Sequence, residues 1–342
     1  MSLQLPWLQL DVFSDRLFAG NPLAVVLDAS ALDGTQMQRI ARWTNLSETA
    51  FLLPVTDPAA DYRVRIFTPR QELPFAGHPS VGAAYAALDS GTVDTGKSRL
   101  VQQCSAGLLP VQIEGTGATR IVHVQAPAAR LREHDATATR RLAAALGAPL
   151  EPADWREIDN GPRWLVCDLG QAGTVRALQP DLAELAALSM GWSVVGACVF
   201  GREHDGDAAM AVRAFCPADG IPEDPVTGSA NAAIAAYLQA TGGLDQYGQH
   251  WRASQGREIG RDGYLEVRWT STVGRSAWAA PAASACAARC SSTLFPERLR
   301  GGRGPRRLRR ARARSRHRPG ASVQPRLYLA RQAQCDNARR VS

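Results

Sequence analysis

Two neighbouring acids, Glu223 and Asp224, precede Pro225, and a glycine, Gly228, comes just before an alanine-rich segment at residues 232–238. That segment is a strong helix former, and proline disfavours the α conformation in the residue before it, so the acids are expected in an extended turn. Glycine lets the backbone approach a ligand closely, and the amides that follow lie at a helix N-terminus, which favours an anion. The segment therefore predicts an acid beside an anion-binding helix start, an arrangement that could support catalysis.

The same arrangement occurs a second time in the chain. Residues 72–79 align with residues 223–230 with Glu, Pro and Gly in register, and the first copy also runs into an alanine-rich segment, residues 82–88. Just upstream, residues 65–69 match residues 213–217. A repeated strand, turn and helix indicates an internal duplication, that is, two similar lobes that each present a helix start.

The length predicts two domains with sizeable cores, but the net charge of +7 is unevenly distributed. From Arg275 onward there are 17 Arg, no Lys, one Glu and one Asp, for a net charge of +15. The first 274 residues hold 22 basic and 30 acidic groups, for a net charge of −8. An acidic body gives no reason to expect nucleic-acid binding.

Cysteine spacing and the N-terminus bear on the compartment. None of the seven cysteines has zinc or redox spacing, apart from a weak C-x3-C at Cys286 and Cys290. Scattered cysteines fit a reducing compartment. The N-terminal residues lack the pattern of a signal peptide, and no apolar segment reaches the length of a membrane span. We expect a cytoplasmic protein without a membrane partner.

Hydrophobic periodicity predicts two runs of elements. In the first run we expect strands at residues 8–13, 23–27, 50–53, 62–67, 100–103, 108–113 and 121–124, and helices at 36–43 and 82–88. In the second run we expect helices at residues 136–146, 182–188 and 232–238, and strands at 164–167, 194–200, 210–215 and 265–269. An Ala- and Pro-rich stretch between the runs predicts an N-terminal lobe at residues 1–125 and a C-terminal lobe at 126–274.

Residues 275–342 form an Arg- and Ala-rich tail with almost no apolar periodicity, so they cannot offset the entropy cost of ordering. The tail has three interpretations: a disordered extension, a basic arm that contacts nucleic acid, or a shifted reading frame of GC-rich DNA. We favour the shifted frame.

Several ordered motifs resemble those of one family. They are residues 11–13 with 20–22, 45–51, 67–69, 77–79 and 223–231. They are similar to the motifs of PhzF, the phenazine-biosynthesis isomerases and their relatives, and the resemblance covers residues 5–274. It implies an α+β, diaminopimelate epimerase-like fold with two pseudo-symmetric lobes, each a curved mixed sheet around a central helix. It also implies an isomerase without cofactor or metal, usually a homodimer, with its site between the lobes.

The resemblance assigns the catalytic residues. Glu48 matches the catalytic glutamate, and a carboxyl whose pKa is raised by a dry cleft could remove a carbon-bound proton and return it. His78 matches a proton relay or hydrogen-bond donor, and Asp224 matches the acid that orients an amino or hydroxyl group of the substrate. The alternatives are a surface glutamate capping a turn, a helix-start histidine bonded to the backbone, and a turn acid.

The remaining implied contacts are substrate-binding ones. Gly77 and Gly228 would admit a carboxylate to the two helix starts. Ser229 would bind that carboxylate through its hydroxyl and amide, or would alternatively be a plain helix N-cap.

Two other functions stay open. Racemases of this fold carry a thiol at each helix start, whereas this chain has His78 and Ser229 there and Cys104 and Cys216 elsewhere, which disfavours an amino-acid epimerase or racemase. A catalytically impaired binding protein with a nucleic-acid-contacting tail is the second alternative. No nucleotide-binding glycine motif is present.

The favoured function is a PhzF-like, cofactor-independent isomerase that moves a carbon-bound proton in a small cyclic or conjugated carboxylate. Its substrate, and any involvement in phenazine synthesis, are left open by the sequence. One departure from the family is expected to matter: residues 274–280 do not alternate like the closing strand that members have there, so a sheet edge would be left unpaired.

Overall fold

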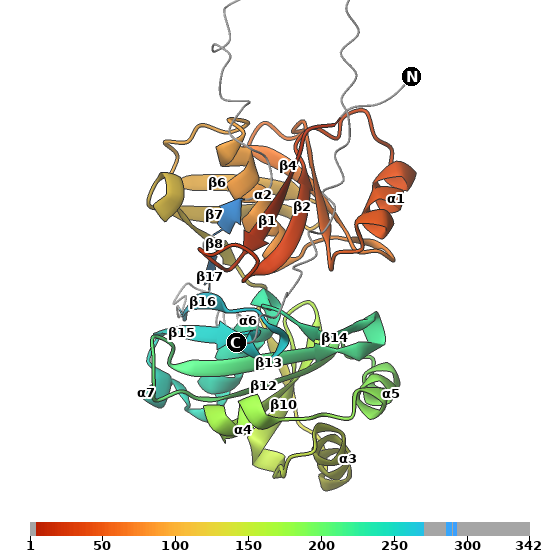
Figure 1. Cartoon of the computed structure of the whole chain (residues 1–342), viewed down its shortest axis with the longest axis vertical. Coiled ribbons are helices and arrows are strands. Elements are labelled where there is room, and N and C mark those ends of the chain that lie inside the picture. The colour runs from red at the N-terminus through yellow and green to blue at the C-terminus, as the bar shows by residue number, and fades with distance from the viewer. Residues whose placement is uncertain (1–4, 270–284, 289, 293–342) are drawn as a thin grey trace, which may run out of the picture. The chain divides into compact units, whose positions relative to one another are not determined.

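The computed structural model describes residues 5–269, 285–288 and 290–292, which all lie in one compact unit, Met1–Phe295. This unit contains two lobes, coloured mainly red to yellow and yellow-green to cyan in Figure 1. Each lobe is a curved mixed sheet with helices, as the resemblance implied. Within the described residues, no helix has both the length and the apolar character needed to cross a bilayer.

The first lobe is built from alternating strands and two helices. Its elements are β1 (Trp7–Val12), β2 (Asn21–Val26), α1 (Gly34–Thr44), β3 (Thr49–Leu53), β4 (Tyr62–Phe67), β5 (Glu72–Leu73), α2 (Gly77–Asp89), β6 (Arg99–Cys104), β7 (Gly107–Glu114) and β8 (Ile121–Gln125). A short 3-10 turn, Gly117–Thr119, separates β7 from β8.

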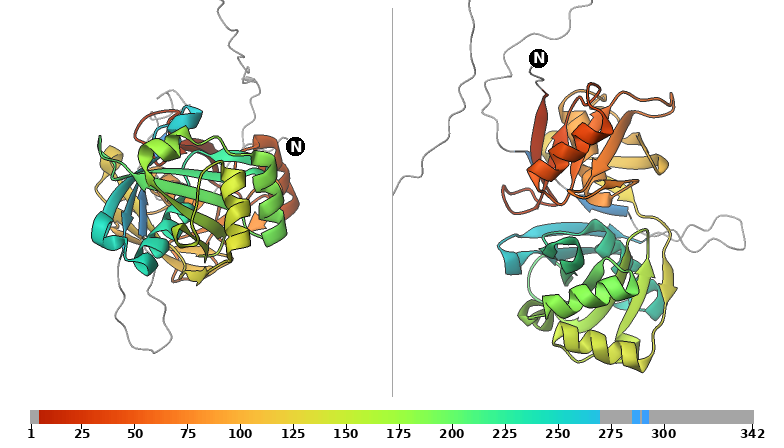
Figure 2. Two further views of the ribbon diagram at one scale, coloured as in Figure 1. Left: turned by 90° about the horizontal axis from the view of Figure 1, so that it is seen from below. Right: turned by 90° about the vertical axis from the view of Figure 1, so that its right-hand side faces the viewer.

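The second lobe follows the same plan with three more helices. Its elements are β9 (Arg130–Arg132), α3 (Ala136–Leu146), β10 (Trp155–Asp159), β11 (Arg163–Gln171), α4 (Ala172–Ala177), α5 (Leu182–Trp192), β12 (Gly196–Arg202), β13 (Met210–Cys216), β14 (Ile221–Asp224), α6 (Gly228–Thr241), α7 (Leu244–Tyr247), β15 (His250–Gln255) and β16 (Gly263–Arg268). Three 3-10 turns also occur, at Pro152–Asp154, Pro217–Asp219 and Arg257–Ile259. Helices α3 and α5 lie side by side (Figure 2), and an ion pair of 3.7 Å joins Arg141 to Glu184 there.

Strand pairing confirms the duplication. In the first lobe β1–β2 is antiparallel, β2–β3 parallel, β3–β4 antiparallel, β4–β6 parallel and β6–β7 antiparallel. In the second lobe β10–β11, β11–β12, β12–β13, β13–β15 and β15–β16 repeat the same succession. Two lobes with one topology and a sequence repeat at the turn-and-helix segment are two copies of one unit.

The duplication extends to side chains in each sheet. Arg65 on β4 makes a bidentate bond to Glu72 on β5, with N–O distances of 2.7 and 2.6 Å. Arg213 on β13 does the same to Glu223 on β14, at 3.0 and 2.8 Å. The second pair is more buried, since both of its side chains are 7% exposed, against 26% and 31% in the first.

The unpaired sheet edge expected after β16 is not found in the part of the chain that the structure describes. Residues 274–280 lie outside the described residues, but β17 (Ala285–Ala288) pairs with β16 and also with β8. Strand β18 (Cys290–Ser292) then pairs with β1, as β9 pairs with β10. The rest of the predicted tail lies outside the described residues, and the lobe boundary at residue 125 stays a prediction.

Each lobe is organised around one buried helix, α2 or α6. Eleven residues of α2 are buried, from His78 to Leu88, and α6 is buried from Ala230 to Leu238. A helix that is apolar on all sides belongs in a core, and small residues allow close packing. At Gly82 a Cβ would overlap Leu23 Cδ2, so any larger residue there would force the buried Leu23 side chain on β2 to shift.

Candidate active site

Glu48 is placed by the end of α1. This helix begins with a capping box between Asp33 and Gln36 and ends at Asn45, whose φ of 53° is left-handed and turns the chain out of the helix. Three residues later Glu48 precedes β3, and its side chain is 19% exposed. The caps at the two ends of α1 therefore determine where the helix stops and hence where Glu48 is placed.

Glu48 and His78 are brought together by different elements of the first lobe. His78 lies in the first turn of α2, its side chain is 7% exposed, and its Nδ1 is 3.1 Å from Glu48 Oε2. His78 therefore bonds a carboxylate, unlike the backbone-bonded histidine of the alternative interpretation. His78 Nε2 is buried and has no partner among the described residues. With Nδ1 committed to Glu48, Nε2 is the ring nitrogen left for a ligand.

The pKa of Glu48 differs from expectation. Burial raises it, but the hydrogen bond and the charge interaction with His78 outweigh burial and leave the pKa below its usual value. The expectation that a dry cleft raises this pKa is wrong, because the nearby imidazole is a tertiary contact that the sequence did not reveal. Glu48 is consequently ionised at neutral pH, which is the form that can accept a proton.

Asp224 is the site acid whose pKa is raised. It is 8% exposed and its pKa is about 6, because burial and the charge of Glu48 outweigh the bonds that it accepts. Asn21 Nδ2 donates to its Oδ1 at 3.1 Å, and Thr227 donates to its Oδ2 at 2.5 Å. Asn21 belongs to the first lobe, so this bond links the lobes at the site.

Ser229 lies inside the first turn of α6. The N-cap of this helix is Thr227, not Ser229. Trp164 Nε1 donates to Ser229 Oγ at 3.2 Å, and Asn160 Nδ2 donates to the Ser229 carbonyl at 2.8 Å. Because an indole N–H can only donate, the hydroxyl accepts this bond and its own hydrogen remains to be directed elsewhere.

The two helix starts face one another. A Cβ on Gly228 would lie 3.9 Å from the backbone nitrogen of His78 and 3.5 Å from Phe13 Cζ. At Gly77 a Cβ would meet nothing within 4 Å. Neither α2 nor α6 has an N-cap side chain bonded to its first turn. Two helix N-termini at one place, neither of them bonded by its N-cap side chain, favour an anion.

All six predicted site residues line one cleft of about 1160 Å³. These residues are Glu48, Gly77, His78, Asp224, Gly228 and Ser229. The walls are largely apolar, and aromatic side chains such as Phe13, Phe75 and Trp164 contribute to them. A volume of this size accommodates a small organic acid. The structure thus brings the predicted residues together, whereas their individual roles stay predictions.

Cys216 also lines this cleft, although the sequence placed it away from the site. Burial, followed by the nearby charge of Asp224, raises the pKa of its thiol well above the usual value. A thiol in this state is a poor base at neutral pH. The helix starts themselves carry His78 and Ser229, as expected.

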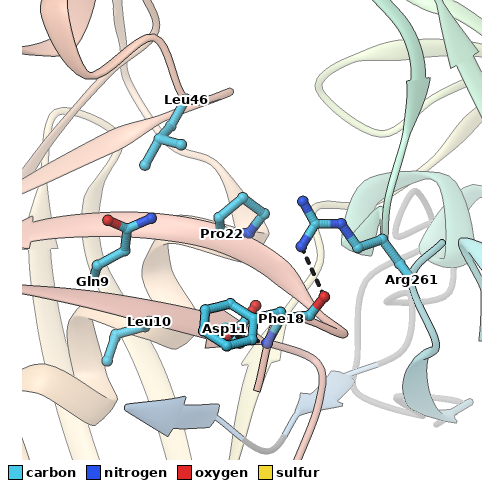
Figure 3. A pocket seen from close by; sticks show the side chains of 7 residues that line it. All are labelled: Gln9, Leu10, Asp11, Phe18, Pro22, Leu46 and Arg261. Atoms are coloured by element: carbon cyan, nitrogen blue, oxygen red, sulfur yellow. Dashed lines mark hydrogen bonds between the residues drawn. The ribbon is translucent and has the colours of Figure 1, made fainter. Parts of the chain in front are cut away.

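A smaller hollow of about 220 Å³, shown in Figure 3, lies beside the β1–β2 loop and contains none of the six predicted site residues. Its only acid, Asp11, accepts a bond of 2.8 Å from the Phe18 amide, and Arg261 donates to the Phe18 carbonyl at 2.9 Å. The first bond holds the loop to β1 and the second joins it to the second lobe, so a structural role explains this hollow better than a ligand site does.

Residues with polar contacts in the site that were not predicted include Asn21, Asn160, Trp164 and Thr227. Asn21 stands in a motif that carried the family resemblance, but its sequence context predicted only a turn. Asn160 precedes Gly161 and Pro162, which also predicts a turn and no more. Among the described residues, no group of three His, Cys, Asp or Glu side chains could hold a metal ion.

The fold and the site define a two-lobed enzyme of the isomerase or epimerase type. Residues 10–280 match the family model of the phenazine biosynthesis-like proteins, PhzC-PhzF. The chain therefore belongs to the PhzF family, and it is an isomerase of that family.

Individual relatives agree with this assignment. Antisense-enhancing sequence 1 of Schizosaccharomyces pombe is 38% identical over 67% of this chain and 79% of its own length. The trans-2,3-dihydro-3-hydroxyanthranilate isomerase of Pseudomonas aeruginosa is 35% identical over 76% of this chain and 88% of its own. The crystal structure of a Bacillus anthracis PhzF-family protein covers 86% of this chain and all of its own, with a TM-score of 0.72 and 24% identity, which supports the fold.

Proposed function

We propose that this protein is a cofactor-independent isomerase that moves a carbon-bound proton within a small cyclic or conjugated carboxylate. The observation that carries the proposal is the contact between Glu48 and His78 in the cleft where two helix starts meet. A base, an adjacent imidazole and an anion-binding region within one cavity are the parts that such a reaction needs.

The chemistry balances without a further reagent. The Glu48 carboxylate removes a proton from one substrate carbon, and the released electron pair shifts through the conjugated system. Glu48, now a carboxylic acid, returns the proton to a second carbon. The imidazole of His78 stabilises the ionised form of Glu48 and offers Nε2 to a polar group of the substrate. Glu48 is ionised at neutral pH, and this is the form that accepts the proton.

The remaining side chains hold the substrate. The helix starts at Gly77 and Gly228, with the Ser229 hydroxyl, bind its carboxylate, and Asp224 orients an amino or hydroxyl group. A homodimer and a cytoplasmic location belong to the same proposal, on the ground of family resemblance and of the sequence.

The test measures deuterium uptake from D2O into a panel of small cyclic acids that includes trans-2,3-dihydro-3-hydroxyanthranilate, the compound in the name of the Pseudomonas relative. Glu48→Gln should lower the rate of uptake by about 100-fold or more, since general acid–base groups contribute on that order. Glu133→Gln removes a carboxylate that is 79% exposed and should leave the rate unchanged. Equal rates in wild type and Glu48→Gln would refute the mechanism.

A further inference from the structure

Asn160 carries a buried polar atom without a partner among the described residues. The side chain lines the cleft, the residue is 1% exposed, and its Oδ1 bonds to nothing described. Leaving a buried acceptor unpaired is costly, and native structures rarely do so without a reason. A ligand in the cleft would remove that cost.

The orientation of the Asn160 amide is fixed by its other bond. Its Nδ2 lies 2.8 Å from the Ser229 carbonyl, which can only accept a hydrogen bond. Exchanging the amide oxygen and nitrogen would place two acceptors against each other, so Nδ2 must face Ser229. Oδ1 is then the remaining atom, and it requires a donor.

The position of Asn160 is held by a short turn. Asn160 lies between β10 and β11, whose register pairs Asp159 with Arg163. The Gly161 amide donates to Asp159 Oδ1 at 3.1 Å, and the φ of Gly161 is 109°, in a region that favours glycine. The acceptor is therefore presented by a tight turn whose two ends are fixed by paired strands.

We infer that Asn160 contacts the substrate and that its Oδ1 accepts a hydrogen bond from an amino or hydroxyl group of the carboxylate. This inference rests on the proposed function, because it names one further contact of the same site. Asn160 accepts next to Ser229, whose hydroxyl hydrogen can be donated. Together they present an acceptor and a donor side by side, which suits a substrate that carries an N–H or O–H near its carboxylate.

The test uses unreactive aromatic probes and titration calorimetry. The probes are 3-hydroxyanthranilate, 3-hydroxybenzoate, which lacks the amino group, and anthranilate, which lacks the hydroxyl. In wild type, removing the group that Asn160 binds should weaken Kd about fivefold to fiftyfold, as expected for one buried hydrogen bond. Asn160→Ala should abolish that selectivity, so that the probes with and without the group bind alike.

Asn160→Asp separates substrate contact from support of Ser229. It keeps an acceptor at this position but loses the bond to the Ser229 carbonyl, so it should retain the selectivity that Asn160→Ala loses. Trp164→Phe disturbs Ser229 from its other side and should also retain the selectivity. Ratios between probes cancel any general loss of affinity.

Two results would overturn the inference. If Asn160→Ala and Asn160→Asp change selectivity alike, Asn160 acts only through Ser229. If wild type binds none of the three probes, the class of ligand is wrong. Deuterium uptake that depends on Glu48 would still stand in either case, so failure here is distinguishable from failure of the proposed function.

Discussion

Replacing Asp224 by Asn should make the protein more stable at neutral pH than at acidic pH, relative to wild type. Asp224 is buried, and its pKa is about 6 instead of the usual 3.8 of an aspartate. A carboxyl with a raised pKa contributes stability below its unfolded pKa, and that stability is lost as pH rises through the folded value. The difference between these two pKa values corresponds to about 3 kcal/mol of stability.

The difference in unfolding free energy between Asp224→Asn and wild type should depend on pH in a defined way. About 1 kcal/mol of the cost is already present at pH 4.5, so the stability of Asp224→Asn relative to wild type should increase by about 2 kcal/mol between pH 4.5 and pH 8. Asparagine keeps an acceptor for Asn21 and can donate to Thr227, whose hydroxyl must then turn. The charge is thus removed with little change of shape.

Urea unfolding at a series of pH values measures this difference directly. Asp205→Asn, at an exposed position, is the matched control and should change stability equally at every pH. A difference between Asp224→Asn and wild type that does not vary with pH would refute the reasoning. If this profile is observed, the ionised Asp224 carboxylate lowers the stability of the protein at neutral pH. We interpret its presence as a requirement of substrate binding.

Two further predictions concern stability. Glu223→Gln should cost about 3–5 kcal/mol in urea unfolding, because it leaves Arg213 as a buried charge without its partner, whereas Glu72→Gln in the more exposed equivalent pair should cost about 1 kcal/mol or less. Similar losses in the two variants would contradict the importance of burial. Glu48→Gln should lower the free energy of unfolding by about 1 kcal/mol at pH 7. His78 lowers the pKa of Glu48, so the ionised carboxylate contributes stability above pH 4.5, and this contribution is lost as pH falls further. A loss that does not become smaller as pH falls below 4.5 would show that the effect is not electrostatic.

Much of the fold was predictable from the sequence because the duplication left repeated side chains. The Arg–Glu pairs on β4–β5 and β13–β14 appear in the sequence as Arg65, Glu72, Arg213 and Glu223 in register. Helix α3 was predicted with its observed bounds, since Asp135 caps its start and Gly147 ends it in a left-handed conformation. Local signals of this kind need no tertiary information.

Elements that depend on tertiary burial were missed. Strand β10, Trp155–Asp159, and strand β15, His250–Gln255, carry polar and charged residues that hide their alternation. Helix α4, Ala172–Ala177, is too short for its period to be seen and contains a glycine. All three elements are stabilised by packing against strands that are distant in the sequence, and a local sequence pattern does not reveal such packing.

The site shows the same division. The motifs identified six of the residues that line the cleft, but they did not reveal the short distance between Glu48 and His78 that lowers the pKa of Glu48. They also gave no sign of Asn160, whose neighbours predict a simple turn. Residue types are local, whereas pKa values and unpaired acceptors are properties of the folded cleft.

The central claim is that one carboxyl both removes and returns the proton. Its most direct test follows exchange with D2O at both reacting carbons of a turned-over substrate, in wild type and in Glu48→Gln. The single-carboxyl mechanism predicts that Glu48→Gln abolishes exchange at both carbons together. Exchange that persists at one carbon without turnover would reveal a second base and contradict it.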